Sequence, residues 1–258
     1  MSDGRVHLTS EGRIATIRFD RPEARNAMTW TMYRELEEAC ARVGSDAAIR
    51  AVVLRGTGGE AFVAGTDIKQ FATFTGAEDG IAYEASIERV LGALDQLSAP
   101  TVAVVEGYAV GGGLLIAAAC DLRIATPDAR FGAPIARTVG NCLSMPSLAR
   151  LVAAFGIGRV QRMLLLAELL DASEALSASF ISAVVAPAEL DARIAAICAS
   201  LESHAPVTLA ATKEGLRRLI QAGLPGDEDL LRRVYGSRDF SEGVAAFVAR
   251  RRPEWQGR

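Results

Sequence analysis

The chain has few of the residues that build metal sites and histidine-centred catalytic triads. It contains 2 histidines, His7 and His204, and neither has a histidine or carboxylate pattern around it. The 4 cysteines are widely spaced and include no C-x-x-C pair, so neither a zinc site nor a disulfide framework is indicated. The sequence therefore predicts no metal centre and a reducing compartment, which we expect to be the cytoplasm.

Long apolar runs and an excess of charge of one sign are also missing. No run approaches the roughly 20 apolar residues that cross a bilayer, and no apolar stretch follows a basic start, as in a secretory signal. With 28 basic and 31 acidic residues the net charge is −3, which indicates neither nucleic acid nor an anionic membrane as a partner. Half of the 258 residues are hydrophobic, enough for a sizeable core, and the length predicts one large domain or one domain with a small appendage.

Strands and helices alternate over the first three quarters of the chain. Alternating residues on either side of Gly12 predict a hairpin, and Thr29 is a candidate cap for a helix to about residue 43. Further strands are expected at 51–54, 61–64, 101–105, 121–125 and 183–186, and further helices at 81–97, 143–155 and 160–170. Irregular lengths between them imply parallel pairing with helical crossovers, while 74–80 reads as an irregular, mobile segment and 133–141 as an atypical loop.

Only helices are expected after Pro187, at 188–203, 206–222, 227–235 and 239–251. This change in pattern predicts an α/β core over residues 1–195 and a helical region over residues 196–258.

The stretch from Pro100 to Pro134 is the centre of the chain. A buried strand turns into three glycines, Gly111 to Gly113, which open an apolar helix. The start of such a helix presents free backbone N–H groups at a positive end, a place that binds anionic oxygen. The alternative is that the glycines merely allow a strand and a helix to pack closely.

Six short segments stand out along nearly the whole chain: RPEARNAM at 21–28, AGTDIK at 64–69, EGYAVGGG at 106–113, CDLRIA at 120–125, FGAP at 131–134 and EGVAAF at 242–247. In this order and spacing they resemble the crotonase (enoyl-CoA hydratase/isomerase) superfamily. The resemblance implies a spiral of repeated ββα units, and a C-terminal helical region that assembles a homotrimer or a dimer of trimers.

The resemblance also implies the substrate and the site. The substrate is expected to be an acyl-CoA thioester, with coenzyme A as part of the substrate and no separate cofactor. The amides of Thr66 and Gly112 are expected to hold the thioester carbonyl oxygen. The expected substrate contacts are Arg25, Ala64, Gly65, Asp67, Ile68, Lys69, Gly111, Leu115, Ile135 and Arg137. The basic residues at 250–252 are expected to reach CoA phosphates of a neighbouring subunit.

At two positions the sequence departs from the family pattern. Hydratases carry one glutamate three residues after the central glycine and a second after the proline of the Phe-Gly-x-Pro segment. Here these positions hold Leu115 and Ile135. Because aliphatic side chains transfer no protons, hydration by the paired-glutamate route is expected to be very slow.

Other residues are candidates for the missing chemistry. Cys142 precedes a predicted helix, whose N-terminus would lower the pKa of its thiol and favour a nucleophile; the alternative is a small half-buried loop residue. Glu106 either points into the site or holds the glycine turn. Glu84 and Glu88 lie one turn apart on a helix and either reach the pocket or form a solvated face. Arg137 is either a binder of carboxylate or phosphate or a plain surface residue.

Three hypotheses follow for function. The first is an enoyl-CoA hydratase/isomerase-class enzyme that stabilises a thioester enolate in a backbone oxyanion hole. The second is a CoA-thioester binding protein without hydratase activity. The third is another chemistry of the family, namely thioester hydrolysis, decarboxylation or dehalogenation, that uses non-standard residues.

Overall fold

A six-stranded sheet forms the base of the computed structural model, which describes residues 3–257. Its strand order is β1-β2-β3-β5-β7-β10, and only the β1–β2 pair is antiparallel. The strands are β1 (Arg5–Glu11), β2 (Ile14–Asp20), β3 (Ala51–Gly56), β5 (Thr101–Val105), β7 (Leu122–Ala125) and β10 (Ala183–Val184). The predicted N-terminal hairpin is confirmed.

A second, four-stranded sheet has the order β4-β6-β8-β9. Its strands are β4 (Ala61–Val63), β6 (Tyr108–Val110), β8 (Arg130–Gly132) and β9 (Leu170–Asp171). β4, β6 and β8 each follow a strand of the first sheet along the chain, and all three run parallel. Each repeat therefore contributes one strand to each sheet. The predicted α/β class with ββα repeats is confirmed.

The helices agree with most of the predicted ones. They are α1 (Trp30–Ser45), α2 (Ala77–Asp95), α3 (Gly112–Ala119), α4 (Ile135–Thr138), α5 (Met145–Phe155), α6 (Ile157–Leu165), α7 (Ala172–Ser177), α8 (Leu190–Ser203), α9 (Pro206–Gln221), α10 (Glu228–Tyr235) and α11 (Arg238–Val248), with 3-10 turns η1 (Pro22–Ala24), η2 (Ile68–Thr73) and η3 (Pro187–Glu189). Thr29 caps α1 as predicted, since its side chain accepts from the Met32 amide at 3.2 Å.

Two segments expected to be irregular are partly helical. α2 begins at Ala77 because the Asp79 carboxylate accepts from the Thr75 amide at 2.6 Å and from the Gly76 amide at 3.3 Å, which satisfies donors at the helix start. The one-turn helix α4 lies inside the segment 133–141. A single turn leaves too short a periodic pattern to be recognised in a sequence.

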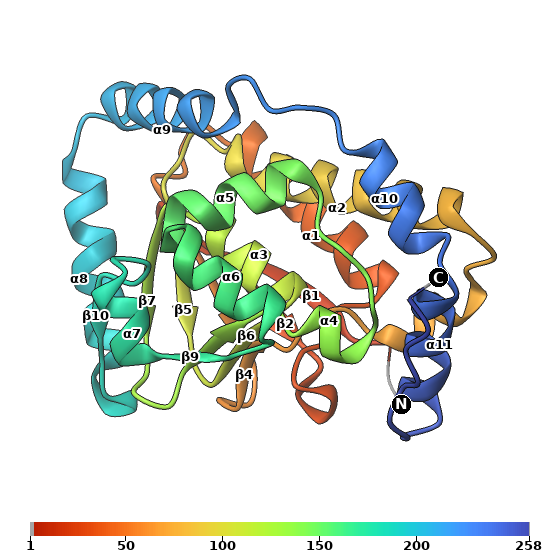
Figure 1. Ribbon diagram of the computed structural model, residues 1–258. Helices are drawn as coiled ribbons and strands as arrows, with labels where there is room; N and C mark the ends of the chain where they lie inside the picture. The colour runs from red at the N-terminus through yellow and green to blue at the C-terminus, as the bar shows by residue number, and fades with distance from the viewer. Residues whose placement is uncertain (1–2, 258) are drawn as a thin grey trace.

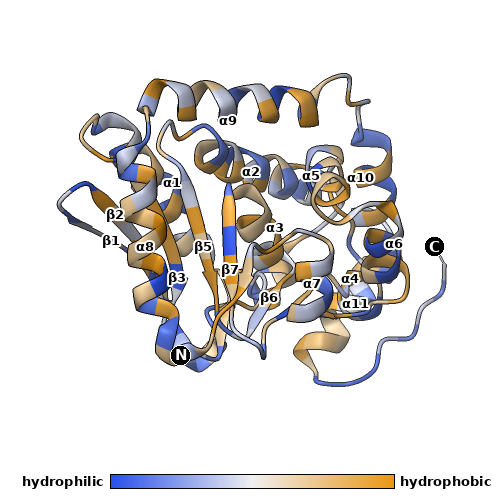
Figure 2. Ribbon diagram, turned by 90° about the vertical axis from the view of Figure 1, so that its left-hand side faces the viewer, coloured by the Kyte–Doolittle hydropathy of each residue, from blue (hydrophilic) through white to orange (hydrophobic). Residues whose placement is uncertain are grey.

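Helices cover both faces of the six-stranded sheet. One face, with α1, α2 and α3, encloses the larger core, and α8 packs against the other face through Leu190, Cys198 and Leu201. β5 is mostly hydrophobic along its length (Figure 2) because it is buried on both sides, as a parallel central strand requires. The predicted boundary near residue 195 falls within α8, which belongs to the core as one helix.

The last three helices surround this core. α9 crosses the top of the molecule in Figures 1 and 2 and has no buried residue. α10 packs on α2, and α11 packs beside η2. Among residues 3–257 no single helix is long and apolar enough to cross a membrane; Pro187–Ser203 and Pro206–Gln221 reach that length only as a pair bent by 104°.

The contact between α2 and α10 can be tested at Gly80. A Cβ atom there would overlap the buried Tyr235 ring, and overpacking of this kind costs about 1–3 kcal/mol. We expect Gly80→Ala to lower the free energy of unfolding by that amount in urea denaturation. Gly92→Ala is the matched control on the same helix: its Cβ would meet only Gln96 Nε2, at 3.7 Å, and a gain of about 0.5–1 kcal/mol is expected. Equal effects of the two substitutions would contradict the packing.

Candidate functional site

A cavity of about 800 Å³ lies where the two glycine-containing bends meet. It is lined by ten of the residues predicted from the sequence: Ala64, Gly65, Thr66, Asp67, Ile68, Lys69, Gly111, Gly112, Leu115 and Ile135. These residues come from the ends of β4, β6 and β8 and the turns that follow them. Parallel pairing of the three strands brings the turns to one edge of the second sheet.

Close approach of the two bends depends on glycine. Gly65 and Gly111 have φ angles of +96° and +55°, in the left-handed region that glycine adopts without strain. A Cβ on Gly111 would lie 3.7 Å from the Cα of Gly65. Met28 fixes the first bend, because its amide donates to the Gly65 carbonyl and its carbonyl accepts from the Asp67 amide, both at 2.8 Å.

Thr66 and Gly112 are therefore neighbours across the two bends. A Cβ on Gly112 would lie 3.2 Å from Thr66 Oγ1. Within residues 3–257, no backbone carbonyl accepts a hydrogen bond from the amide of Thr66 or of Gly112. Gly112 is the first residue of α3, where helix amides lack intrahelical partners and the helix dipole is positive.

The ion pair between Arg21 and Asp67 holds the first bend in place. Arg21, which is 5 % exposed, places Nη1 at 2.9 Å from Asp67 Oδ2, and Asp67 Oδ1 accepts from the Lys69 amide at 3.2 Å. These contacts hold the turn between Thr66 and Lys69. Because Asp67 already accepts these bonds, its carboxylate acts in the structure of the bend.

Three hydroxyl groups form a cluster behind the bends. The Tyr33 hydroxyl lies 2.8 Å from Thr66 Oγ1, and the Tyr83 hydroxyl lies 3.1 Å from the same atom. Burial raises the pKa of both tyrosines above the usual range, so both phenols are neutral. The cluster links α1 and α2 to the bend that carries the Thr66 amide.

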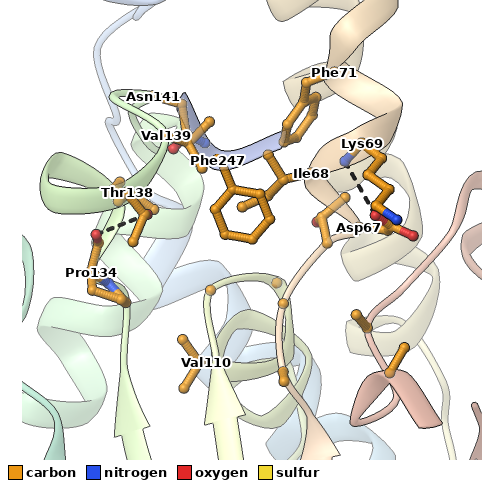
Figure 3. A pocket seen from close by; sticks show the side chains of 18 of the residues that line it. Asp67, Ile68, Lys69, Phe71, Val110, Pro134, Thr138, Val139, Asn141 and Phe247 are labelled. Carbon is orange, nitrogen blue, oxygen red and sulfur yellow. Dashed lines mark hydrogen bonds between the residues drawn. The ribbon is translucent and has the colours of Figure 1, made fainter. Parts of the chain in front are cut away.

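Residues of the C-terminal tail line the cavity. Figure 3 shows the Phe247 ring between Ile68 on one wall and Val139 on the other, above the turn at Val110. Phe247, Val248, Arg250 and Arg251 all line the cavity of their own chain. Contact of residues 250–252 with a neighbouring subunit stays a prediction.

One carboxyl of the lining is deeply buried. Glu84 is 3 % exposed and lines the cavity. Its Oε1 accepts from the Tyr235 hydroxyl at 2.5 Å, and its Oε2 accepts from the Ser144 amide at 3.3 Å. Loss of hydration on burial raises the pKa of Glu84 to about 7, against the lowering effect of these two hydrogen bonds. The alternative of a solvated helix face is wrong for Glu84.

Four predicted site residues lie outside the cavity lining. Glu106 accepts from Arg55 Nε at 2.6 Å and is held there. Arg25 is exposed and lies over the Tyr108 ring at 5.2 Å. Arg137 is exposed on α4. These positions match the alternatives of a loop-holding Glu106 and a surface Arg137.

Cys142, the fourth of these residues, has the opposite of the expected pKa shift. Burial, with a smaller effect of Glu84 and Asp227, raises the pKa of its thiol to about 12. The next helix, α5, begins three residues later, and the Ser144 side chain accepts from an amide of its first turn. The expectation of an activated thiolate is wrong.

The chemistry of the lining suits an acyl group with an anionic extension. Leu115, Ile135 and Val110 make an apolar wall, whereas Lys69, Arg250 and Arg251 add positive charge. Within the described part of the chain, no group of three or more His, Cys, Asp or Glu side chains is placed to hold a metal ion. The arrangement offers two amides without backbone acceptors, Thr66 in the first bend and Gly112 at the start of α3, together with one buried carboxyl and no paired carboxylates.

Comparisons with known proteins give the same family throughout. The family model described as enoyl-CoA hydratase/isomerase matches residues 9–258. The short-chain-enoyl-CoA hydratase of Clostridium acetobutylicum is 31 % identical over 256 residues, covering 96 % of each chain.

Two solved structures show the likeness in three dimensions. An enoyl-CoA hydratase/carnithine racemase from Magnetospirillum magneticum is 32 % identical, with a TM-score of 0.80 over 98 % of this chain and 96 % of that one. A methylmalonyl-CoA decarboxylase in complex with 2-nitronate-propionyl-CoA is 25 % identical, with a TM-score of 0.90 over 98 % and 99 %.

The buried carboxyl predicts how stability depends on pH. The pKa of Glu84 is 4.5 in an unfolded chain and about 7 in the fold, so between these values the folded state binds more protons. The free energy of unfolding should therefore fall as pH rises through this window, by on the order of 3 kcal/mol. Glu84→Gln should remove this pH dependence, so that the free energy of unfolding of the variant rises relative to that of the natural protein between pH 5 and pH 8. Urea denaturation at several pH values measures the difference.

Glu88→Gln is the matched control, since Glu88 accepts from the Ser144 hydroxyl at 2.5 Å and faces Arg150 at 3.6 Å. The Glu88→Gln variant should still show the fall in the free energy of unfolding that Glu84 causes as pH rises. A difference between Glu84→Gln and the natural protein that is constant with pH would contradict the assignment.

Proposed function

This chain belongs to the enoyl-CoA hydratase/isomerase family, and from that premise we propose that it forms a thioester enolate held by the amides of Thr66 and Gly112. It is an acyl-CoA-processing enzyme of this family. The observation that supports the proposal is the juxtaposition of these two residues at one cavity, with both amides free of backbone acceptors.

The proposed reaction develops negative charge on the thioester oxygen. Two donors fixed before the reaction stabilise that charge without reorganisation, and loss of one donor costs about 3–4 kcal/mol. Buried tyrosines behind Thr66 keep the bend in place. The apolar wall excludes water, which strengthens each remaining electrostatic interaction.

Hydration by paired glutamates is not the chemistry that these residues support. Leu115 is 3 % exposed, and Ile135 also lines the cavity. Neither can position or deprotonate a water molecule. We propose a reaction with proton transfer at the α-carbon, such as double-bond isomerisation, in place of the addition of water.

Decarboxylation of a malonyl-type thioester is the second candidate. A bond from the α-carbon to the carboxylate breaks, its electron pair enters the enolate, CO₂ leaves, and the α-carbon takes up one proton. This reaction needs no base to begin, which agrees with an aliphatic side chain at both glutamate positions. The overlap with a methylmalonyl-CoA decarboxylase structure favours this candidate.

The tail supports two further proposals. Arg250 and Arg251 at the cavity mouth would bind the phosphates of coenzyme A, since guanidinium groups match phosphate oxygens. α9 has no buried residue and exposes Val207, Leu216 and Leu219. An unpartnered apolar face of this kind suits packing between copies of the chain in a trimer.

Solvent isotope incorporation tests the enolate. In D₂O, short acyl-CoA thioesters incubated with the protein should gain deuterium at the α-carbon, and a malonyl-type thioester that is a substrate should lose CO₂ and gain one deuterium. Mass spectrometry of the thioesters measures both. A protein that binds the whole panel in calorimetry, but leaves every mass unchanged, would be a CoA-thioester binding protein instead.

The Gly112 amide can be tested on its own after one adjustment. Any side chain at 112 would collide with the Tyr33 hydroxyl, so the test uses a Tyr33→Phe background. Gly112→Pro deletes the donor, and its fixed φ suits the first residue of a helix. The matched control, Gly112→Ala, adds a Cβ and keeps the N–H.

The rate of deuterium incorporation by the proline variant should be about a hundred- to thousand-fold below that of the alanine variant. Similar rates for the two double variants would reject Gly112 as a donor to the oxyanion.

A further inference from the structure

The cavity has one buried carboxyl that the proposed oxyanion site does not use. Of the acidic residues in its lining, Glu23 is exposed, Asp67 is paired with Arg21, and Glu84 is buried. No arginine or lysine within residues 3–257 forms an ion pair with Glu84. A carboxyl kept from water without a cationic partner is costly for a fold, and function is a frequent reason for such a cost.

We propose that Glu84 is the proton-transfer residue of this enzyme and takes over, from a different helix, the task of the two glutamates that the chain lacks. This inference rests on the proposed enolate chemistry and names the group that completes it. It assigns to α2 a chemical role that the residues at 115 and 135 cannot perform.

Tyr83, the residue before Glu84, connects α2 to the bend that contains Thr66. Tyr83, one residue earlier on α2, reaches Thr66 Oγ1 with its hydroxyl at 3.1 Å. Tyr83, Glu84 and Ile87 all line the cavity. α2 thus contacts the bend that carries one amide donor and also contributes Glu84 to the lining of the same cavity.

One helix and a loop hold the carboxyl of Glu84 in place. Tyr235 from α10 donates to one oxygen, and the Ser144 amide donates to the other. The Asn141 amide nitrogen lies 3.4 Å from the Tyr235 hydroxyl, while Asn141 Oδ1 is buried with no partner in the described chain. Because Asn141 also lines the cavity, its free oxygen leaves an acceptor open next to the carboxyl.

The charges around Glu84 favour a neutral carboxyl at low pH and an ionised one at high pH. Glu88 on α2 and Asp227 before α10 raise its pKa, as does burial, and Tyr83 and Cys142 are neutral neighbours. Arg150, the nearby cation, pairs with Asp95 at 2.6 Å and faces Glu88 at 3.6 Å. A group that titrates near 7 serves both as a donor and as an acceptor of protons.

The proton transfer by Glu84 balances both in isomerisation and in decarboxylation. In isomerisation, ionised Glu84 removes a proton from the α-carbon, the C–H electron pair enters the enolate, and the proton returns to the γ-carbon. After loss of CO₂ from a malonyl-type thioester, neutral Glu84 donates its proton to the α-carbon and becomes ionised, and solvent then reprotonates it. Neither route needs an oxidant, a reductant or a metal.

The test measures deuterium exchange into butyryl-CoA as a function of pH. The natural protein should show a rate with an inflection near 7. Glu84→Gln should slow exchange by roughly 10²–10⁴-fold and remove the inflection, and Glu84→Asp should recover part of the rate. Glu88→Gln, the control one turn away, should keep the rate and still show an inflection, moved to lower pH because the charge of Glu88 raises the pKa of Glu84.

A second readout does not depend on turnover. The carboxyl carbon of Glu84, followed by NMR with isotope-labelled glutamate and assigned by its loss in Glu84→Gln, should titrate at a different pH when butyryl-CoA is bound. A titration that bound ligand leaves unchanged, or full exchange activity in Glu84→Gln, would overturn the role of Glu84. A ligand-sensitive titration without exchange into any thioester by the natural protein would overturn the enolate function, and the proton-transfer role with it.

Discussion

The close approach of two glycine bends is the constraint on which the rest of the site depends. The bends lie so close that a Cβ on Gly111 would be 3.7 Å from the Cα of Gly65, and the positive φ angles of both glycines would strain any other residue. The parallel pairing of β4 with β6 delivers the bends to one edge of the second sheet. The fold is thus a device for holding two backbone amides side by side, and the side chains around them are free to differ between members of the family.

Because the bends are held by backbone contacts, the side chains around them can change while the fold stays the same. The proposed oxyanion site is made of main-chain amides, so aliphatic side chains at Leu115 and Ile135 leave it in place although neither can carry a proton. In the proposed mechanism Glu84 carries the proton from α2, and the wall at these two positions stays apolar. The low polarity of that wall raises the pKa of the one carboxyl that remains, which makes it useful for proton transfer at neutral pH.

Much of the fold and both bends could be predicted from the sequence because the residues that determine them are close together in the chain. The hairpin around Gly12, the Thr29 cap and the glycines of both bends act within a few residues of where they are read. The three-residue strands β6 and β8 show no alternation long enough to identify, and their pairing depends on distant segments. The burial of Glu84 was equally hidden, since its partner Tyr235 lies 151 residues further along the chain.

The C-terminal helices belong to the site as much as the α/β core does. Phe247 from α11 lines the cavity, and Tyr235 from α10 donates to the carboxyl of Glu84. Tyr235 packs against Phe240 of α11, which in turn contacts Phe71, so the position of α11 affects the packing that holds Tyr235. The C-terminal helices therefore contribute both to the lining of the cavity and to the hydrogen bonds of Glu84.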